Sequence, residues 1–187
     1  SLVIAMERLY GISDMTKENI AELNRMFVKN VGRPDYRTYI MKEVCGIERS
    51  VDDFWTDDIP GNTTDLFIQM WQPKKYVMGP SGCPTLDEWC GECEAEFKRV
   101  MGQGAGGLKI ALAYERSLYF EEVSPAKAEA LYSEYIFKGG EGEFPKPLQD
   151  YMMHTVLKLA NDNHIVVQIH TGLQEGIGHD LSNSNPM

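Results

Sequence analysis

The residues best suited to chemistry lie near the end of the chain, in the segment VVQIHTGLQEG (166–176). A run of apolar, mostly β-branched residues leads directly into His170, Thr171 and Gly172. Imidazole is the commonest metal ligand in proteins, so a histidine at the end of a strand is a candidate ligand. The same position also suits a histidine that only hydrogen-bonds to neighbouring backbone. The residue type alone leaves both interpretations open.

A second group of polar residues follows the segment GGLKIALAY (106–114), which has the length of a strand. Tyr114, Glu115 and Arg116 come at its end. Parallel strands end at a common edge of their sheet, where α/β folds gather their chemistry. We therefore expect these residues to share an edge with His170. Tyr114 and Arg116 are candidates for substrate contact, because the guanidinium can hold a carboxylate through two hydrogen bonds; a solvated surface arginine is the alternative.

Three further polar residues, Glu175, His179 and Asp180, lie on the loop after His170 and could reach the same site. Of these, Glu175 is the candidate for substrate contact. Lys109 comes near the beginning of its predicted strand, which places it deep in the sheet rather than at the carboxyl edge. We expect Lys109 to pair with a carboxylate there, because an unpaired buried charge is costly.

The cysteines Cys45, Cys83, Cys90 and Cys93 include one CxxC pair, which raises the possibility of a zinc knuckle. A structural zinc site needs a second close pair or nearby histidines, and no histidine occurs before position 154. The segment from Thr85 onward has the pattern of a helix, which would place Cys90 and Cys93 on one face. Packing as reduced thiols is therefore the favoured interpretation.

The composition is that of an ordinary globular protein, with 43% hydrophobic and 25% charged residues in 187. The net charge of −10 argues against a nucleic-acid or anionic-membrane partner, since both require clustered Lys and Arg. No apolar run approaches the roughly 18 residues that span a bilayer, and the first residues lack the pattern of a signal peptide. These features predict a cytoplasmic location.

The order of the predicted elements indicates an α/β fold with a parallel sheet covered by helices. Thr16, Thr85 and Ser124 are candidate N-caps, and the strand at 165–169 is expected to be buried sheet. Helices are predicted over 13–30, 33–47, 85–104, 124–137 and 146–163, and strands over 66–71, 74–79, 106–114 and 164–170.

Two of these segments, GLKIALAYERSL (107–118) and VQIHTGLQEGIGHDLSNSNPM (167–187), resemble the amidohydrolase superfamily, and more narrowly its amidohydrolase-2 branch. That branch shows a Lys-containing strand ending in Ala-Tyr-Arg, then a Gln-Ile-His-Thr-Gly strand and a Leu-x-x-x-Asn-Pro segment. The resemblance extends over 105–187 and is weaker over the helical N-terminal half.

The resemblance implies a (β/α)₈ barrel with a divalent metal, commonly zinc, at the carboxyl ends of its strands. His170 matches the metal ligand of the fifth strand. The family's other ligands, a His-x-His pair and a later His and Asp, have no counterpart in this chain. We therefore expect 66–187 to be part of a TIM-like barrel, with 1–65 as a helical region inserted near it. Alone, the chain is expected to be inactive and to self-associate through exposed strand edges.

The implied function is that of a fragment of a metal-dependent hydrolase. It would act on a small polar, carboxylated substrate through a metal-activated water. A sugar-acid isomerase resembling the uronate isomerases is a close variant. The rival hypothesis is a non-catalytic, regulatory barrel domain that lacks the metal.

Overall fold

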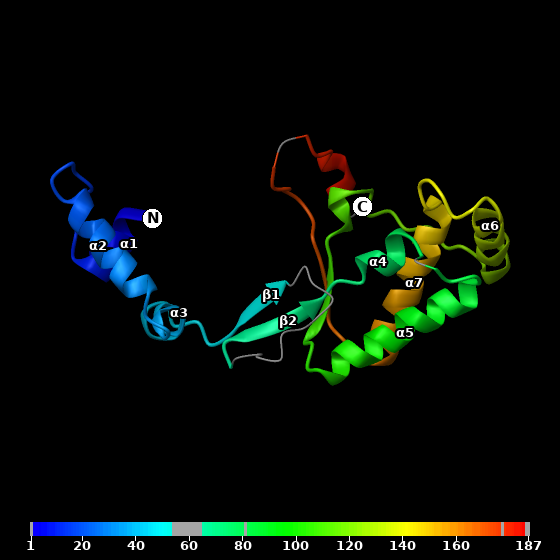
Figure 1. The fold of residues 1–187 in the computed structure, drawn as a ribbon, viewed down its shortest axis with the longest axis horizontal. Coiled ribbons are helices and arrows are strands. Elements are labelled where there is room, and N and C mark those ends of the chain that lie inside the picture. The colour runs from blue at the N-terminus through cyan, green and yellow to red at the C-terminus, as the bar shows by residue number, and fades with distance from the viewer. Residues whose placement is uncertain (1, 54–64, 81, 177, 186–187) are drawn as a thin grey trace. The chain divides into compact units, whose positions relative to one another are not determined.

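The computed structural model describes residues 2–53, 65–80, 82–176 and 178–185 (Figure 1). The chain forms two compact units, Ser1–Ser50 and Val51–Met187. In the described ranges, no helix combines the length and the apolar character that crossing a bilayer requires. The insertion of 1–65 near a barrel stays a prediction.

The first unit is helical, with α1 (Leu2–Tyr10), α2 (Ile20–Val31), the short α3 (Tyr36–Thr38) and a π-helical turn (Tyr39–Val44). Its helices line an apolar groove of about 440 Å³. At the groove, the hydroxyls of Tyr10 and Tyr36 are hydrogen-bonded at 2.8 Å. Burial, together with this hydrogen bond, raises the pKa of Tyr10 to about 12.

The predicted N-cap at Thr16 is wrong, because α2 begins only at Ile20 and has no side-chain cap. Thr16 instead takes part in a turn: its hydroxyl accepts from the Glu18 N–H, and its own N–H donates to the Asn19 side chain. Such local side-chain bonds compete with the first turn of a helix. The sequence pattern shows the apolar face of α2 and overestimates its length.

The second unit contains a four-stranded sheet in the order β1-β2-β3-β4. Its strands are β1 (Ser50–Asp53), β2 (Phe67–Trp71), β3 (Gly107–Ile110) and β4 (Val167–Ile169). β2 pairs with β3 in parallel, and β3 pairs with β4 in parallel, with Leu108 opposite both Trp71 and Val167. The predicted parallel sheet is therefore confirmed for these three strands.

Helices pack on one face of this sheet through a common core, and Figure 1 shows α7 crossing α5, with which it is in contact. The helices are α4 (Lys74–Met78), α5 (Leu86–Gly102), α6 (Pro125–Phe137) and α7 (Lys146–Asp162). Thr85 and Ser124 cap α5 and α6 as predicted, since their hydroxyls accept from the N–H groups of Glu88 and Lys127. The shared core includes Trp71, Phe97, Val100, Leu108, Ile110, Leu148, Met152 and Val156.

The strand predicted at 74–79 is wrong, because these residues form the helix α4. The Pro73 carbonyl accepts the N–H of Tyr76 and closes the first turn. Tyr76 and its neighbour Val77 are both buried, and the Trp89 indole donates to the Tyr76 carbonyl. In a strand with one buried face, buried and exposed side chains would alternate, whereas here two consecutive side chains are buried. The length of a short apolar segment therefore does not show whether it forms a strand or a helix.

The expectation that 165–169 is buried is also wrong. Val166 is 66% exposed and Ile169 is 45% exposed. The strand lies last in the order of the sheet, so within the described residues only β3 flanks it. A run of β-branched residues predicts a strand correctly but does not reveal whether that strand is central or at an edge.

Cys83 and Cys93 are buried and Cys90 is partly buried, which agrees with packing as thiols. The Cys90 thiol lies 3.7 Å from the Met152 sulfur. Burial raises the pKa of Cys93 to about 12 and that of Cys90 to about 11, so both stay protonated near neutral pH.

Gly107 gives a direct test of the sheet. A Cβ at this position would lie 2.7 Å from the carbonyl oxygen of Val166 and 2.7 Å from the Met70 methyl group. We predict that Gly107→Ala lowers the free energy of unfolding by about 1–3 kcal/mol, because the backbone of the neighbouring strand must shift. Urea denaturation followed by circular dichroism measures the loss.

The control is Gly102→Ala, at the end of α5, where a Cβ would meet no atom within 4 Å. This variant should be neutral or slightly stabilising. Equal stability of both variants would contradict the close approach of the strands at Gly107.

Candidate functional site

The candidate site lies at the carboxyl edge of β3 and β4, where the structure brings His170 and Tyr114 together. The His170 N–H donates to the Ile110 carbonyl at 2.8 Å, which continues the ladder past the end of β4. After β3 the chain turns through a 3₁₀ helix, Leu112–Tyr114. The rings of Tyr114 and His170 then meet with their centroids 5.0 Å apart.

The imidazole of His170 has a backbone partner on the following loop. Its Nε2 lies 3.0 Å from the Leu173 carbonyl oxygen. Because a carbonyl can only accept, Nε2 carries the proton in this arrangement, and the lone pair is on Nδ1. A backbone carbonyl on the second nitrogen is one of the partners through which proteins orient a metal-binding imidazole, together with carboxylates and water.

Tyr114 is the centre of a small aromatic cluster that also includes His179. The ring of His179 stands at 87° to that of Tyr114, with 5.2 Å between centroids. The hydroxyl of Tyr114 accepts from the backbone N–H of Glu175 at 3.3 Å. Tyr114 therefore contacts His170, His179 and the backbone of Glu175, so the two predicted loop residues lie near His170.

Asp180 is engaged elsewhere. Its Oδ1 accepts from the N–H and hydroxyl of Ser182, at the start of the 3₁₀ helix Leu181–Ser184. These hydrogen bonds lower the pKa of the Asp180 carboxyl group. The contacts of Asp180 therefore support a capping role.

Gln174, which no sequence pattern indicated, holds the loop after β4 in place. It is buried, and its amide nitrogen donates to the Ala113 carbonyl at 2.6 Å and to the Ser184 hydroxyl at 3.1 Å. Gln174 thus joins the 3₁₀ helix after β3, the loop after β4 and the last 3₁₀ helix. A glutamine on a polar loop gives no sequence signal of such burial.

Arg116 lies in a structural ion pair. Its Nη2 is 2.7 Å from Oδ1 of Asp150, and the two side chains are 10% and 1% exposed. The same guanidinium donates to Gln149 and to the carbonyls of Ser117 and Tyr119. These contacts use the guanidinium N–H groups that were expected to hold a substrate carboxylate. They favour a structural role for Arg116, which connects the loop after β3 to α7.

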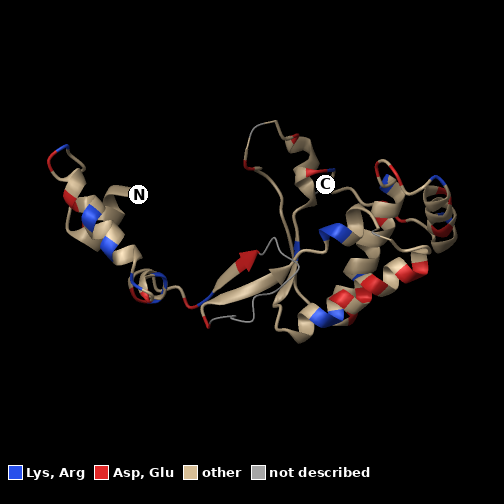
Figure 2. Ribbon diagram, viewed as in Figure 1, with Lys and Arg blue, Asp and Glu red and all other residues tan. Residues whose placement is uncertain are grey.

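Two more polar contacts cross the sheet. Lys74, at the start of α4, forms an ion pair with Glu115 and so joins the segments after β2 and β3. Lys109 donates to the Gln168 side chain at 3.3 Å. Among the described residues no carboxylate pairs with Lys109, so the predicted carboxylate partner is replaced by an amide. Figure 2 shows most charged residues of this unit on its helices, whereas β2 carries none.

As a metal site the cluster is incomplete. In the described part of the chain, no three His, Cys, Asp or Glu side chains come close enough to hold an ion. His170 fits one position of a ligand set, because its ring is oriented and its Nδ1 lone pair is available. Catalytic zinc sites take about three protein ligands, so the described residues supply part of such a set.

No protein-family model matches the chain, and no curated protein matches it. Solved structures do share its fold. A protein from Lactobacillus casei, described as a metal-dependent hydrolase, is 17% identical with a TM-score of 0.62; the match covers 98% of this chain and 49% of that one.

Two sugar-acid isomerases are similar in the same way. Uronate isomerase from Thermotoga maritima is 18% identical with a TM-score of 0.62, over 91% of this chain and 43% of that one. Glucuronate isomerase from Caulobacter crescentus is 13% identical with a TM-score of 0.63, over 98% and 44%. The chain therefore spans about half the length of these proteins and shares their fold, consistent with a partial TIM barrel.

The Arg116–Asp150 pair predicts a large stability effect. Asp150→Asn would keep the shape of the side chain but leave the buried guanidinium without its counter-charge. We expect a loss of about 3 kcal/mol in the free energy of unfolding, measured by urea denaturation.

Asp162→Asn serves as the matched control, because Asp162 pairs with Lys158 on the exposed surface of α7. This substitution should produce no measurable change, since exposed pairs are screened by solvent. A similar small effect of both substitutions would show that the Arg116 pair is not desolvated.

Proposed function

We propose that this chain is part of a metal-dependent hydrolase of the amidohydrolase type, with His170 as one metal ligand. The observation that carries the proposal is the oriented imidazole of His170, held by the Leu173 carbonyl at the carboxyl edge of a parallel sheet. The fold supports it, because a described metal-dependent hydrolase shares that fold. The remaining ligands would come from outside the described residues.

Zinc is the metal we propose; when bound, it supplies an activated water near neutral pH and polarises a substrate carbonyl. His170 would hold it through Nδ1, while the Leu173 carbonyl fixes the plane of the ring. Tyr114 would contact the substrate: its hydroxyl already accepts from the Glu175 N–H, which leaves its own proton free to donate to a substrate oxygen. Glu175 is exposed beside it and is the second proposed contact.

A sugar-acid isomerase is the second candidate. The observation that favours it is the similarity to a uronate isomerase and a glucuronate isomerase at the same TM-scores. Both candidates use the same edge of the sheet and a small carboxylated substrate. They differ in the reaction, which the described residues leave open.

The metal proposal predicts zinc binding that depends on His170. We expect His170→Ala to weaken zinc binding by roughly 10-fold or more, the loss typical even of outer-shell groups. Competition with a chromophoric zinc indicator measures the affinity of the 187-residue chain.

The control is His164→Asn, which removes an imidazole from the turn before β4. His164 has a φ of 55°, and asparagine tolerates this left-handed conformation. The control should retain the affinity for zinc. Equal zinc binding by both variants would count against His170 as a ligand and would favour the non-catalytic alternative.

We also propose that the chain self-associates through β4. Val166, directly before β4, and Ile169, at its end, are exposed, and an exposed apolar edge strand favours pairing with another chain. Val166→Lys should shift the protein toward monomer in size-exclusion chromatography with light scattering, because lysine on an edge opposes pairing.

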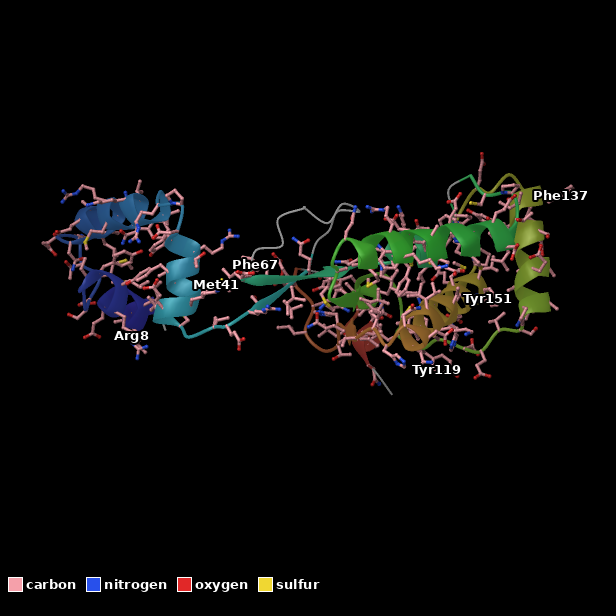
Figure 3. The ribbon with its side chains drawn as sticks, turned by 90° about the horizontal axis from the view of Figure 1, so that it is seen from below. Arg8, Met41, Phe67, Tyr119, Phe137 and Tyr151 are labelled. Carbon is pink, nitrogen blue, oxygen red and sulfur yellow. The ribbon has the colours of Figure 1, made fainter. Side chains whose placement is uncertain are left out.

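Phe137→Lys is the control, since Phe137 is 92% exposed at the end of α6 and projects away from that helix (Figure 3). It should leave the association unchanged. A monomeric unsubstituted chain, or dissociation by Phe137→Lys alone, would contradict association through β4.

A further inference from the structure

A row of polar side chains crosses the sheet one layer below His170. Lys109 on β3 lies opposite Gln168 on β4, and Trp71 on β2 lies opposite Leu108. Gln72 is the residue directly after β2, so continuing this register places it level with Lys109. Lys109 and Gln168 therefore form a row across two neighbouring strands, and Gln72 extends it at the end of β2.

The burial of the neighbouring residues shows which face this row occupies. Trp71, Leu108 and Ile110 belong to the core beneath the helices. Side chains alternate along a strand, so Lys109 and Gln168 lie on the opposite face, and Gln72 follows the same alternation as the residue directly after Trp71. In a sheet that is part of a barrel, that face is the interior.

His170 lies on the same face as the row. It is two residues beyond Gln168, and its N–H continues the ladder to β3. Two residues of a strand span roughly 7 Å, which is one layer of side chains. A molecule of sugar size bound at His170 would reach down to Lys109.

The charge of Lys109 is not neutralised by the described residues. Its Nζ donates to Oε1 of Gln168, which is a neutral acceptor. The nearest carboxylate in the contacts of the row is Asp53, and it accepts from the Gln72 amide at 2.6 Å. An ammonium group has three donors, so two remain for a ligand after the bond to Gln168.

We propose that Gln72, Lys109 and Gln168 form an anion-binding layer that takes the carboxylate of the substrate. Lys109 supplies the charge, and Gln168 positions the ammonium by accepting one of its protons. Gln72, hydrogen-bonded to Asp53, forms the boundary of the layer next to β2. The assignment rests on the proposed function for the site above it, and it names the group that would make that site select acids over neutral analogues.

The test uses D-glucuronate and D-glucose as probes, because they share a ring and differ by a carboxylate in place of a hydroxymethyl group. Lysine side chains of the full chain are labelled biosynthetically with ¹³C,¹⁵N-lysine, which leaves the ammonium groups intact, and the Lys109 signal is identified by its loss in Lys109→Arg. Titration with glucuronate should shift the Lys109 signal, and glucose should not.

Ligand-detected NMR then compares affinities. The unsubstituted chain should bind glucuronate roughly 10-fold more tightly than glucose, the effect of one charged hydrogen bond. Lys109→Met should abolish this preference, and Lys109→Arg should retain part of it. Lys127→Met, at an exposed position on α6, is the matched control and should retain all of it. Urea denaturation of each variant confirms that it is folded.

Absence of a carboxylate-dependent shift at Lys109, or an unchanged preference in Lys109→Met, would overturn the proposal. His170→Ala separates the two proposals. If that variant keeps the preference for glucuronate while no form of the chain binds zinc, the anion layer stands and the metal proposal fails. If zinc binding depends on His170 and glucuronate binds no better than glucose, the anion layer fails alone.

Discussion

The parallel pairing of β3 with its two neighbours is the constraint on which the rest of the second unit depends. β3 is only four residues long, yet it pairs with β2 on one side and β4 on the other. Its glycine at 107 lets the Val166 carbonyl and the Met70 side chain approach within distances that a Cβ would not allow. The register set here places the ends of β3 and β4 at one edge, and it also aligns the polar row across the opposite face.

Around this pairing, buried polar groups hold the loops. The Arg116–Asp150 pair connects the segment after β3 to α7, and Gln174 connects the loop after β4 to the 3₁₀ helix after β3. Both contacts are shielded from water, where an unsatisfied partner is costly, so each specifies one loop conformation. These contacts fix the segments that carry Tyr114, His170 and His179.

The sequence predicted the elements whose local signals agree with their surroundings. Thr85 and Ser124 precede amphipathic segments, and both are observed as N-caps. The predictions were wrong where contacts distant in sequence determine the structure. Residues 74–78 have the length and apolar content of a strand but form a helix after Pro73. β4 is an exposed edge strand, which no local pattern indicates.

The same distinction applies at the site. The proximity of His170 and Tyr114 could be predicted, because each follows the end of a strand and parallel pairing brings those ends together. The partner of Arg116 lies 34 residues away on another element, so its engagement could not be read from its neighbours in sequence. Gln174 and Lys74 gave no signal, since their roles come from contacts between loops.

The placement of the aromatic residues has a consequence for spectroscopy. Trp71 and Trp89 are both buried in the core of the second unit, whereas residues 1–50 contain no tryptophan and have three tyrosines. Two of these, Tyr10 and Tyr36, share a hydrogen bond. Tryptophan emission therefore reports on the second unit alone, whereas tyrosine absorbance combines these three tyrosines with the six of the second unit. A change in tyrosine absorbance without a change in tryptophan emission would therefore mark unfolding that is confined to the helical unit.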